Sequence, residues 1–171
     1  RRLCLLLLLL LIGGMALLRL PGSALYPSGF GSLGGHDFVE YWSGARLLWR
    51  GGNPYDPDAL LAVEQAAGWP EAEPLLMWNP PWTLVLVLPL APLPFGLATV
   101  GWLLLQLGLV LGSGVLLWRY FAPGDGRYWI GLLLAAGFVP GLFALRIGQI
   151  SPWLLAGVAG FLWAERSRRD L

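Results

Sequence analysis

Apolar residues are gathered into five stretches, separated by breaks that are charged or rich in proline and glycine. In lipid, only internally hydrogen-bonded helices and closed barrels leave no backbone polar group unsatisfied. The first stretch is close to the roughly 20 residues that a helix needs to cross the hydrocarbon layer. The pattern therefore predicts an all-α fold, that of a polytopic helical membrane protein. The stretches cover residues 3–18, 82–93, 95–118, 129–145 and 150–164.

Basic residues at both ends of the chain limit the number of crossings, because they favour the cytoplasmic side. Arginines at residues 1, 2, 166, 168 and 169 predict that both ends are cytoplasmic, which requires an even number of crossings. The stretch 82–93 is short and contains Pro89 and Pro92, so we expect it to be re-entrant or interfacial. A single membrane domain over residues 1–171 is then predicted, with transmembrane helices at 3–19, 95–118, 129–146 and 150–165, an extracytoplasmic loop at 20–77, and a re-entrant or short segment at 78–94.

A signal peptide is the alternative interpretation of the first stretch, since two arginines precede it. No small-x-small cleavage site follows before Arg19, which favours a retained helix.

Composition excludes several classes of site. Hydrophobic residues make up 57% of the chain and charged residues 12%, about half the charged share of a soluble domain. Cys4 is the only cysteine and His36 the only histidine, so an internal disulfide, a zinc cluster and a Ser-His-Asp triad lack their usual residues. Basic residues are scattered, which argues against a nucleic-acid partner.

The predicted loop contains a helix-like pattern that suggests an amphipathic helix lying on the membrane surface. Glu40, Ser43 and Arg50 occupy other directions than its apolar residues. The helix is broken after Arg50 by glycine, asparagine and proline. A second, short helix is predicted to start at Asp56-Pro57 and to end near Gly68. The apolar residues at helical spacing are Phe38, Tyr41, Trp42, Ala45, Leu48 and Trp49.

Asp37 puts a carboxylate at the start of this aromatic helix. A carboxylate there can accept a proton from a hydroxyl group beside the membrane, as a general base does. The alternative is structural, because Asp37 followed three residues later by Glu40 resembles a capping box. The residue pattern leaves both interpretations open.

Arg146 and Gln149 lie between two apolar stretches, where ionisable and polar residues are functional candidates. Arg146 could also extend its charged end to the interface without any further role. On the predicted topology it shares the extracytoplasmic side with Asp37, so a cation and a carboxylate could line one pocket.

Three motifs, in order, resemble the N-terminal part of glycosyltransferase family 87. They are HDFVEYWSGARLLWRGGNPYD, WNPPWTLVLVLPLAPLPFG and RIGQISPWLLAGVAGFLWAERSRR. The resemblance covers roughly residues 3–169, and the motifs appear in the family's order and approximate spacing. The resemblance implies a GT-C-type membrane enzyme that takes a sugar, typically mannose, from a polyprenyl phosphate carrier, and it suggests that this chain is an N-terminal fragment of such an enzyme.

The resemblance also implies roles for individual residues. The aspartate of the family's D-F-x-x-Y-W motif is the catalytic base and corresponds to Asp37. Two departures affect the carry-over: Asn79 stands where tyrosine is common, and the asparagine usual soon after Gly-Gln is absent. Other family elements correspond to Pro54-Tyr55-Asp56, Asn79-Pro80-Pro81 and Gly148-Gln149.

The resemblance, together with the apolar pattern, therefore implies a bacterial, multi-pass membrane mannosyltransferase with Asp37 as general base. Its donor would be a polyprenyl-phosphate-linked sugar, its acceptor a lipid or glycan hydroxyl, and its surroundings membrane lipids, with no cofactor and no metal. Arg146 or Arg46 would stabilise the departing phosphate. The alternative is a non-enzymatic polytopic protein, such as a transporter fragment or lipid-binding subunit. Predicted substrate-binding residues are Tyr41, Arg46, Tyr55, Asp56, Arg146 and Gln149.

Overall fold

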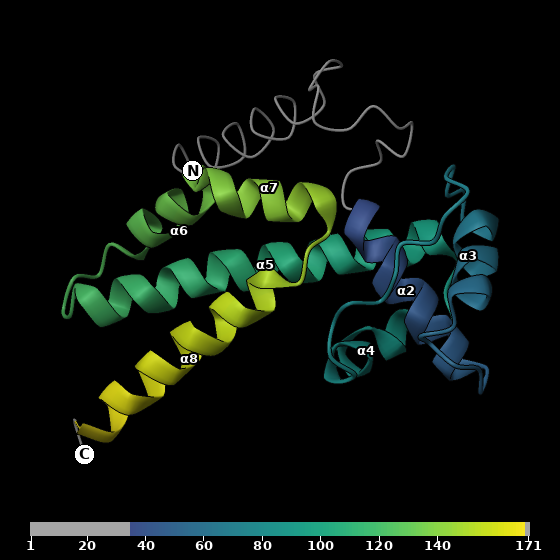
Figure 1. The fold of residues 1–171 in the computed structure, drawn as a ribbon. Coiled ribbons are helices and arrows are strands. Elements are labelled where there is room, and N and C mark those ends of the chain that lie inside the picture. Colours follow the sequence, from purple (N-terminus) through teal and green to yellow (C-terminus); the bar gives the residue numbers. More distant parts are fainter. Residues whose placement is uncertain (1–34, 170–171) are drawn as a thin grey trace. The chain divides into compact units, whose positions relative to one another are not determined.

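Residues 35–169 are described by a computed structural model, and every regular element within them is a helix (Figure 1). The predicted all-α fold is confirmed for these residues. The predicted first membrane helix, residues 3–19, lies outside them. The elements are α2 (His36–Trp49), α3 (Pro57–Ala66), α4 (Trp82–Val87), the 3₁₀ helix η1 (Leu88–Leu90), α5 (Phe95–Phe121), α6 (Tyr128–Gly137), α7 (Val139–Ile147) and α8 (Ser151–Arg169).

The described residues form two compact units. The first, called here the α2 unit, comprises residues 35–103 and 146–149. The second, called the apolar unit, comprises residues 104–145 and 150–169. Helix α5 contributes to both, since its residues 95–103 belong to the α2 unit and the remainder to the apolar unit.

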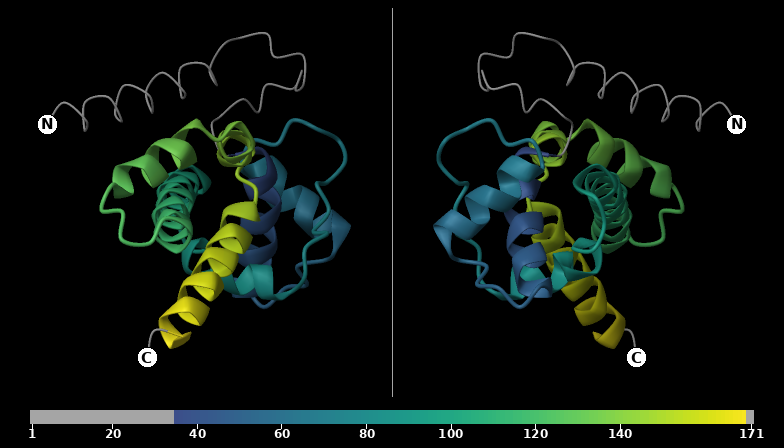
Figure 2. Two further views of the ribbon diagram at one scale, coloured as in Figure 1. Left: turned by 90° about the vertical axis from the view of Figure 1, so that its left-hand side faces the viewer. Right: turned by 90° about the vertical axis from the view of Figure 1, so that its right-hand side faces the viewer.

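Helix α2 is the centre of the α2 unit. It packs against α3, α4 and η1 (Figure 2), and all residues from Phe38 to Ala45 are buried. The predicted surface helix is therefore wrong for this segment. Glu40 is only 6% exposed and Ser43 is fully buried, because neighbouring elements cover the side that we expected to face water. Only the C-terminal end, residues 48–50, is exposed.

Aromatic side chains hold α2 against the start of α5. Phe38 stacks on Trp102 with ring centroids 5.1 Å apart, and also on Phe95 at 6.1 Å. Trp42 contacts Phe95 at 5.3 Å, one turn further along α2. Phe38 and Trp102 are fully buried. Since buried aromatic pairs combine large apolar area with a favourable ring geometry, these contacts explain why α2 is buried rather than exposed.

The segment 78–94 contains only short helical pieces. α4 has six residues and η1 three. At about 1.5 Å per residue, nine helical residues extend roughly 14 Å, less than half of the hydrocarbon thickness. Pro89 lies within η1 and Pro92 follows it, and neither can donate a backbone hydrogen bond. These pieces are too short to form a complete crossing by themselves.

The apolar unit contains the long part of α5 together with α6, most of α7, and α8. The 27 residues of α5 extend about 40 Å, enough to cross a bilayer. The predicted span 129–146 consists of two helices, α6 and α7, bent by 61° at a break. α8 carries Glu165 and several arginines in its last turns, which shortens its apolar part. Among the described residues, one helix has the length and composition of a membrane span, or two if the bent pair is counted, so four crossings are not confirmed.

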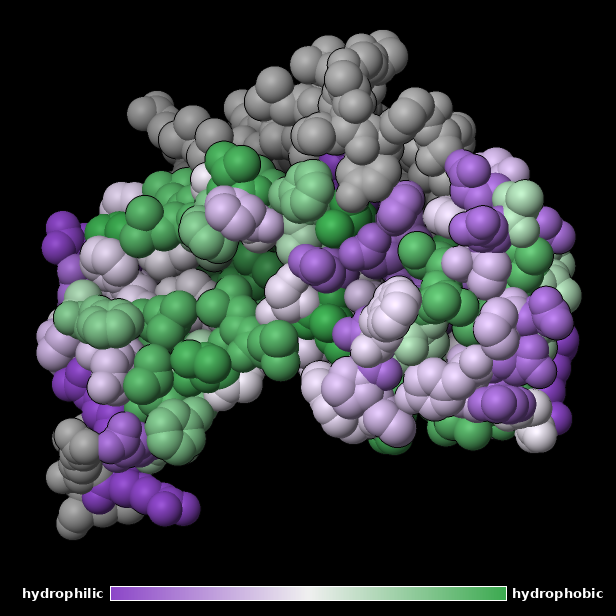
Figure 3. All heavy atoms as spheres, in the orientation of Figure 1, coloured by the Kyte–Doolittle hydropathy of each residue, from purple (hydrophilic) through white to green (hydrophobic). Residues whose placement is uncertain are grey.

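The apolar unit has a strongly hydrophobic surface (Figure 3). Leu104 is 65% exposed on α5 and Phe161 is 67% exposed on α8. Contiguous apolar surface of this kind is unusual on soluble monomers, whereas a helix in lipid needs apolar side chains all round. Such a surface is typical of helices in contact with lipid.

Helices α5 and α6 approach each other at two glycines. A Cβ atom added to Gly114 would lie 2.5 Å from the carbonyl oxygen of Gly131 and 2.6 Å from the Cβ of Ala135. Small residues at helix crossings allow such close backbone approach and are frequent in membrane bundles. The absence of a side chain at both positions is thus a requirement of this packing.

We predict that Gly114→Ala destabilises the protein by about 1–3 kcal/mol, because the added methyl group must push α6 away. The matched control is Gly112→Ala in the same helix, where a Cβ meets nothing within 4 Å. This control should be neutral or stabilising by up to about 1 kcal/mol, since alanine favours helix over glycine. Thermal unfolding in detergent compares the two, and equal stabilities would contradict the packing described.

Candidate functional site

Asp37 lies in the first turn of α2 and does not cap it. The N-cap residue is Gly35, with no side-chain cap hydrogen bond, so the helix begins two residues earlier than a capping box would require. His36 Nδ1 lies 2.8 Å from Asp37 Oδ1, and the two side chains are 23% and 21% exposed. Negative charge near a helix N-terminus is favourable. Asp37 is therefore a partly exposed carboxylate held by a neighbouring imidazole.

Glu40, one turn further along α2, is a buried carboxyl group that the sequence analysis did not select as a candidate. Its Oε1 accepts a hydrogen bond from the backbone N–H of Trp78 at 3.1 Å and another from the Asn79 side-chain amide at 3.2 Å. The capping-box interpretation is therefore wrong for Glu40 as well. The sequence feature that could have indicated its burial is an acidic residue flanked on both sides by apolar and aromatic residues, namely Phe38, Val39, Tyr41 and Trp42.

Burial perturbs two carboxyl groups in the α2 unit. It raises the pKa of Glu40 from 4.5 to about 7, against the opposing hydrogen bonds from Asn79 and Trp78, while the charges of Asp37 and Glu64 raise it further. Burial likewise raises the pKa of Glu64 to about 7, opposed by the hydrogen bond from the Leu75 N–H. Groups with pKa values near neutrality are frequent at functional sites.

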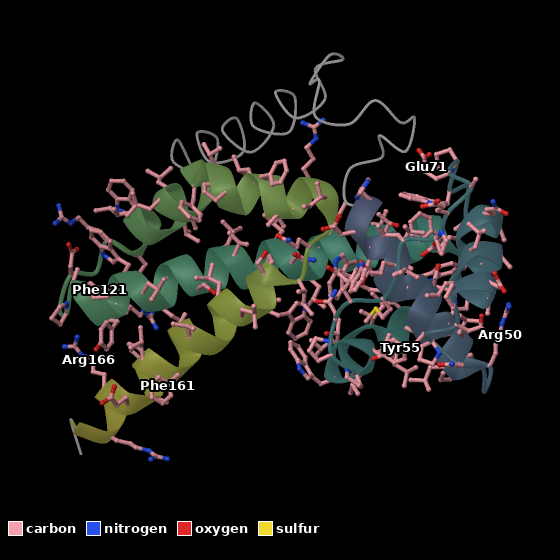
Figure 4. All side chains as sticks on the ribbon, viewed as in Figure 1. Arg50, Tyr55, Glu71, Phe121, Phe161 and Arg166 are labelled. Carbon is pink, nitrogen blue, oxygen red and sulfur yellow. The ribbon has the colours of Figure 1, made fainter. Side chains whose placement is uncertain are left out.

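The turn before α3 has a local structural role and also reaches the Trp78–Pro81 segment. Asp56 Oδ1 accepts hydrogen bonds from the N–H groups of Asp58 and Ala59, which confirms the predicted helix start. The Tyr55 hydroxyl donates to the carbonyl oxygen of Asn79 at 3.5 Å. The Tyr55 ring is 41% exposed, and Figure 4 shows it at the surface of the α2 unit. Asn79 thus joins this turn to α2.

Arg46 binds backbone carbonyl groups. Its Nη1 donates to the carbonyl oxygens of Ala91 at 2.8 Å and Leu93 at 3.3 Å. Its guanidinium also lies 4.9 Å from the centre of the Trp42 ring. These contacts fasten the segment after η1 to α2.

The RIGQ element, residues 146–149, belongs to the same compact unit as Asp37. The Trp102 Nε1–H donates to the Gly148 carbonyl oxygen at 2.8 Å, within the core. Gly148 has a φ of 80°, a conformation that favours glycine. Trp102 also contacts Phe38 and the buried Tyr41. The same tryptophan therefore connects α2 with the element that carries Arg146 and Gln149.

The predicted site residues come from three sequence segments of the α2 unit. Asp37 and Tyr41 lie on α2, Tyr55 and Asp56 on the following turn, and Arg146 and Gln149 at and just after the end of α7. Gln149 is exposed, whereas Tyr41 is only 3% exposed. Within residues 35–169, no group of three or more histidine, cysteine, aspartate or glutamate side chains could hold a metal ion.

The raised pKa values predict that stability falls as pH increases. Because the pKa values of Glu40 and Glu64 are about 7 in the folded protein against 4.5 when hydrated, the folded state binds protons more tightly. Their contribution is complete below pH 4.5 and is lost through pH 7. We expect unfolding in detergent to require about 2–3 kcal/mol less at pH 8 than at pH 5 for each of the two groups. A Glu40→Gln/Glu64→Gln variant should show a smaller difference, and an unchanged difference would contradict the assignment.

Comparison with known proteins identifies the family. Residues 78–171 match the family model of Glycosyltransferase family 87. The match covers more than half of the chain, including the Trp78–Pro81 segment and the RIGQ element, whereas α2 and Asp37 precede it. No curated protein and no solved structure matches the chain. The chain therefore belongs to glycosyltransferase family 87, as its motifs predict.

Proposed function

We propose that the protein is a multi-pass membrane enzyme that transfers a sugar, mannose in the simplest case, from a polyprenyl phosphate to an acceptor hydroxyl. Transfer takes place on the extracytoplasmic side of a bacterial cell membrane. The observation that carries the proposal is Asp37, a partly exposed carboxylate on the first turn of a buried helix, in a chain that belongs to a glycosyltransferase family.

In the proposed reaction, Asp37 accepts the proton of the acceptor hydroxyl as its oxygen attacks the anomeric carbon. The bond between that carbon and the phosphate oxygen breaks, its electron pair leaves with the polyprenyl phosphate, and the anomeric configuration inverts. The His36 ring, 2.8 Å from Asp37 Oδ1, orients the carboxylate. General-base catalysis of this kind contributes about 10² to 10⁴ in rate.

The departing phosphate needs a cation or hydrogen-bond donors. We assign this role to Arg146, which belongs to the same compact unit as Asp37, with Gln149 as a further donor. Arginine suits it because its guanidinium can contact two phosphate oxygens at once.

The acceptor is proposed to contact the turn that precedes α3. Tyr55 offers a partly exposed aromatic ring there, and Asp56 retains a second carboxylate oxygen while Oδ1 caps α3. Tyr41, buried against Trp102, supports the substrate-facing part of α2 from beneath.

Asp37→Asn tests the proposed base. We expect sugar transfer to fall about 10² to 10⁴-fold, because the amide cannot accept the proton. The measurement is transfer from radiolabelled polyprenyl phosphate mannose in membranes of cells expressing the complete gene that encodes this chain.

Asp58→Asn is the matched control, because Asp58 occupies the equivalent first-turn position of α3 and is exposed. Both variants lose the same favourable charge at a helix N-terminus, yet only Asp37→Asn should lose transfer. Full transfer by Asp37→Asn at equal expression would disprove its role as base. Absence of transfer by the wild type would disprove the donor assignment.

A further inference from the structure

An irregular segment, residues 69–79 and called here the strap, lies between α3 and α4 in sequence and is attached to both α2 and α3. The first attachment is aromatic. The Trp69 ring meets the His36 ring edge-on, with centroids 5.6 Å apart, and the Trp69 Nε1–H donates to the Glu73 carbonyl oxygen within the strap. Because His36 pairs with Asp37, the strap begins beside the proposed base.

The other attachments are made by two buried carboxyl groups. Glu64 of α3 is fully buried, and its Oε2 accepts the Leu75 N–H at 3.0 Å. Glu40 of α2 accepts the Trp78 N–H and the Asn79 amide. The strap's outer residues 71–73 are exposed, and Figure 4 shows Glu71 at the surface, whereas Met77 is buried. The strap therefore has an inner side fixed by carboxyl groups and an outer side in water.

Carboxyl groups are a costly means of holding a strap. An ionised carboxylate removed from water loses hydration that a few hydrogen bonds do not fully replace. A glutamine would accept the same N–H groups without that cost. The carboxyl groups instead make the attachment depend on protonation. One of them, Glu40, lies one helical turn from Asp37 on α2.

We propose that Glu40 is a positioning residue that holds the strap closed beside Asp37, and that the strap opens when Glu40 loses its proton and becomes hydrated. The role in transfer rests on the proposed function, whereas the attachment itself does not. The titratable groups around Glu40 are Asp37 and its partner His36 on α2, and Glu64 on α3. From the strap, Glu40 meets the neutral donors of Trp78 and Asn79, while Glu71 and Glu73 are exposed on the outer side.

The expected size of the effect follows from linkage. Burial in the closed structure holds the pKa of Glu40 at about 7, although the strap's hydrogen bonds from Asn79 and Trp78 lower it, whereas a hydrated glutamate has a pKa near 4.5. Opening should therefore become about 10-fold more favourable between pH 6 and pH 8 through Glu40 alone. The Asp37 and Glu64 charges act in the same direction, because they repel an ionised Glu40.

Hydrogen–deuterium exchange at the amides of Leu75 and Trp78 reports directly on the attachment. In the wild type in detergent, protection of both should fall about 10-fold or more from pH 6 to pH 8, after correction for intrinsic exchange. Glu40→Gln keeps an acceptor oxygen but cannot ionise, so its loss of protection should be smaller by about 10-fold. Glu40→Leu, which has no acceptor, should expose the Trp78 amide at both pH values. Glu71→Gln, an equal change of charge on the outer side, should behave as the wild type.

The same preparations are assayed for transfer at pH 6. Glu40→Gln should stay within about 2-fold of the wild type in kcat/KM, and Glu40→Leu should lose at least about 10-fold.

The proposal is overturned if wild-type protection is the same at pH 6 and pH 8, or if Glu40→Gln keeps the full pH dependence. Exchange as expected, with transfer by the wild type but no loss in Glu40→Leu, would refute the positioning role. Exchange as expected without any transfer by the wild type would instead refute the proposed function and leave only the attachment.

Discussion

The burial of α2 is the constraint on which the α2 unit depends. Eight consecutive residues, Phe38 to Ala45, are withdrawn from water, and the stacked Phe38 and Trp102 rings fix the helix to the start of α5. Burial favours a hydrogen-bond partner for a charged or polar side chain, above all for a carboxyl group. Glu40 accepts hydrogen bonds from the Trp78–Asn79 segment. Arg46, at the edge of the buried part, donates to the carbonyl oxygens of Ala91 and Leu93. The irregular segments around α2 are ordered by its polar groups as much as by apolar packing.

This arrangement brings residues of distant sequence position into one unit. The RIGQ element follows the long apolar helices, yet its Gly148 carbonyl oxygen accepts the Trp102 Nε1–H. Asn79 contacts both Glu40 and Tyr55, so the polar residue that replaces the family's common tyrosine has a structural role here. The apolar unit is packed differently. Its helices expose aliphatic and aromatic side chains suited to lipid, and α5 and α6 approach each other at glycine residues.

Local chemistry predicted a good part of the fold. The start of α3 followed from Asp56-Pro57, since capping depends on neighbouring residues alone. The start of α5 at Phe95 followed from a long uncharged run, although the helix continues to Phe121, beyond the predicted end at residue 118. Pro140 near the start of α7 explains the bend in the predicted span 129–146, because proline lacks the N–H needed to continue α6. The apolar pattern alone did not indicate where such a break would fall.

Long-range contacts could not be predicted. Helical spacing correctly identified the aromatic side of α2, but it carries no information on what covers the opposite side, so Glu40 and Ser43 were expected in water and are buried. The role of Glu40 depends on Trp78 and Asn79, nearly forty residues away. Asp37 remains a predicted base, whereas its suggested role as a cap is wrong because the N-cap of α2 is Gly35 instead.

Thiol labelling of Ser43→Cys tests the burial of α2 most directly, because the substitution is nearly isosteric. In a Cys4→Ala background, which removes the chain's only other thiol, the folded protein should resist a water-soluble maleimide at position 43 and react only after denaturation. Arg50→Cys, at the exposed end of α2 (Figure 4), should react at once. Equal labelling rates at the two positions would contradict a buried α2, and with it the positioning of Asp37 and the strap described here.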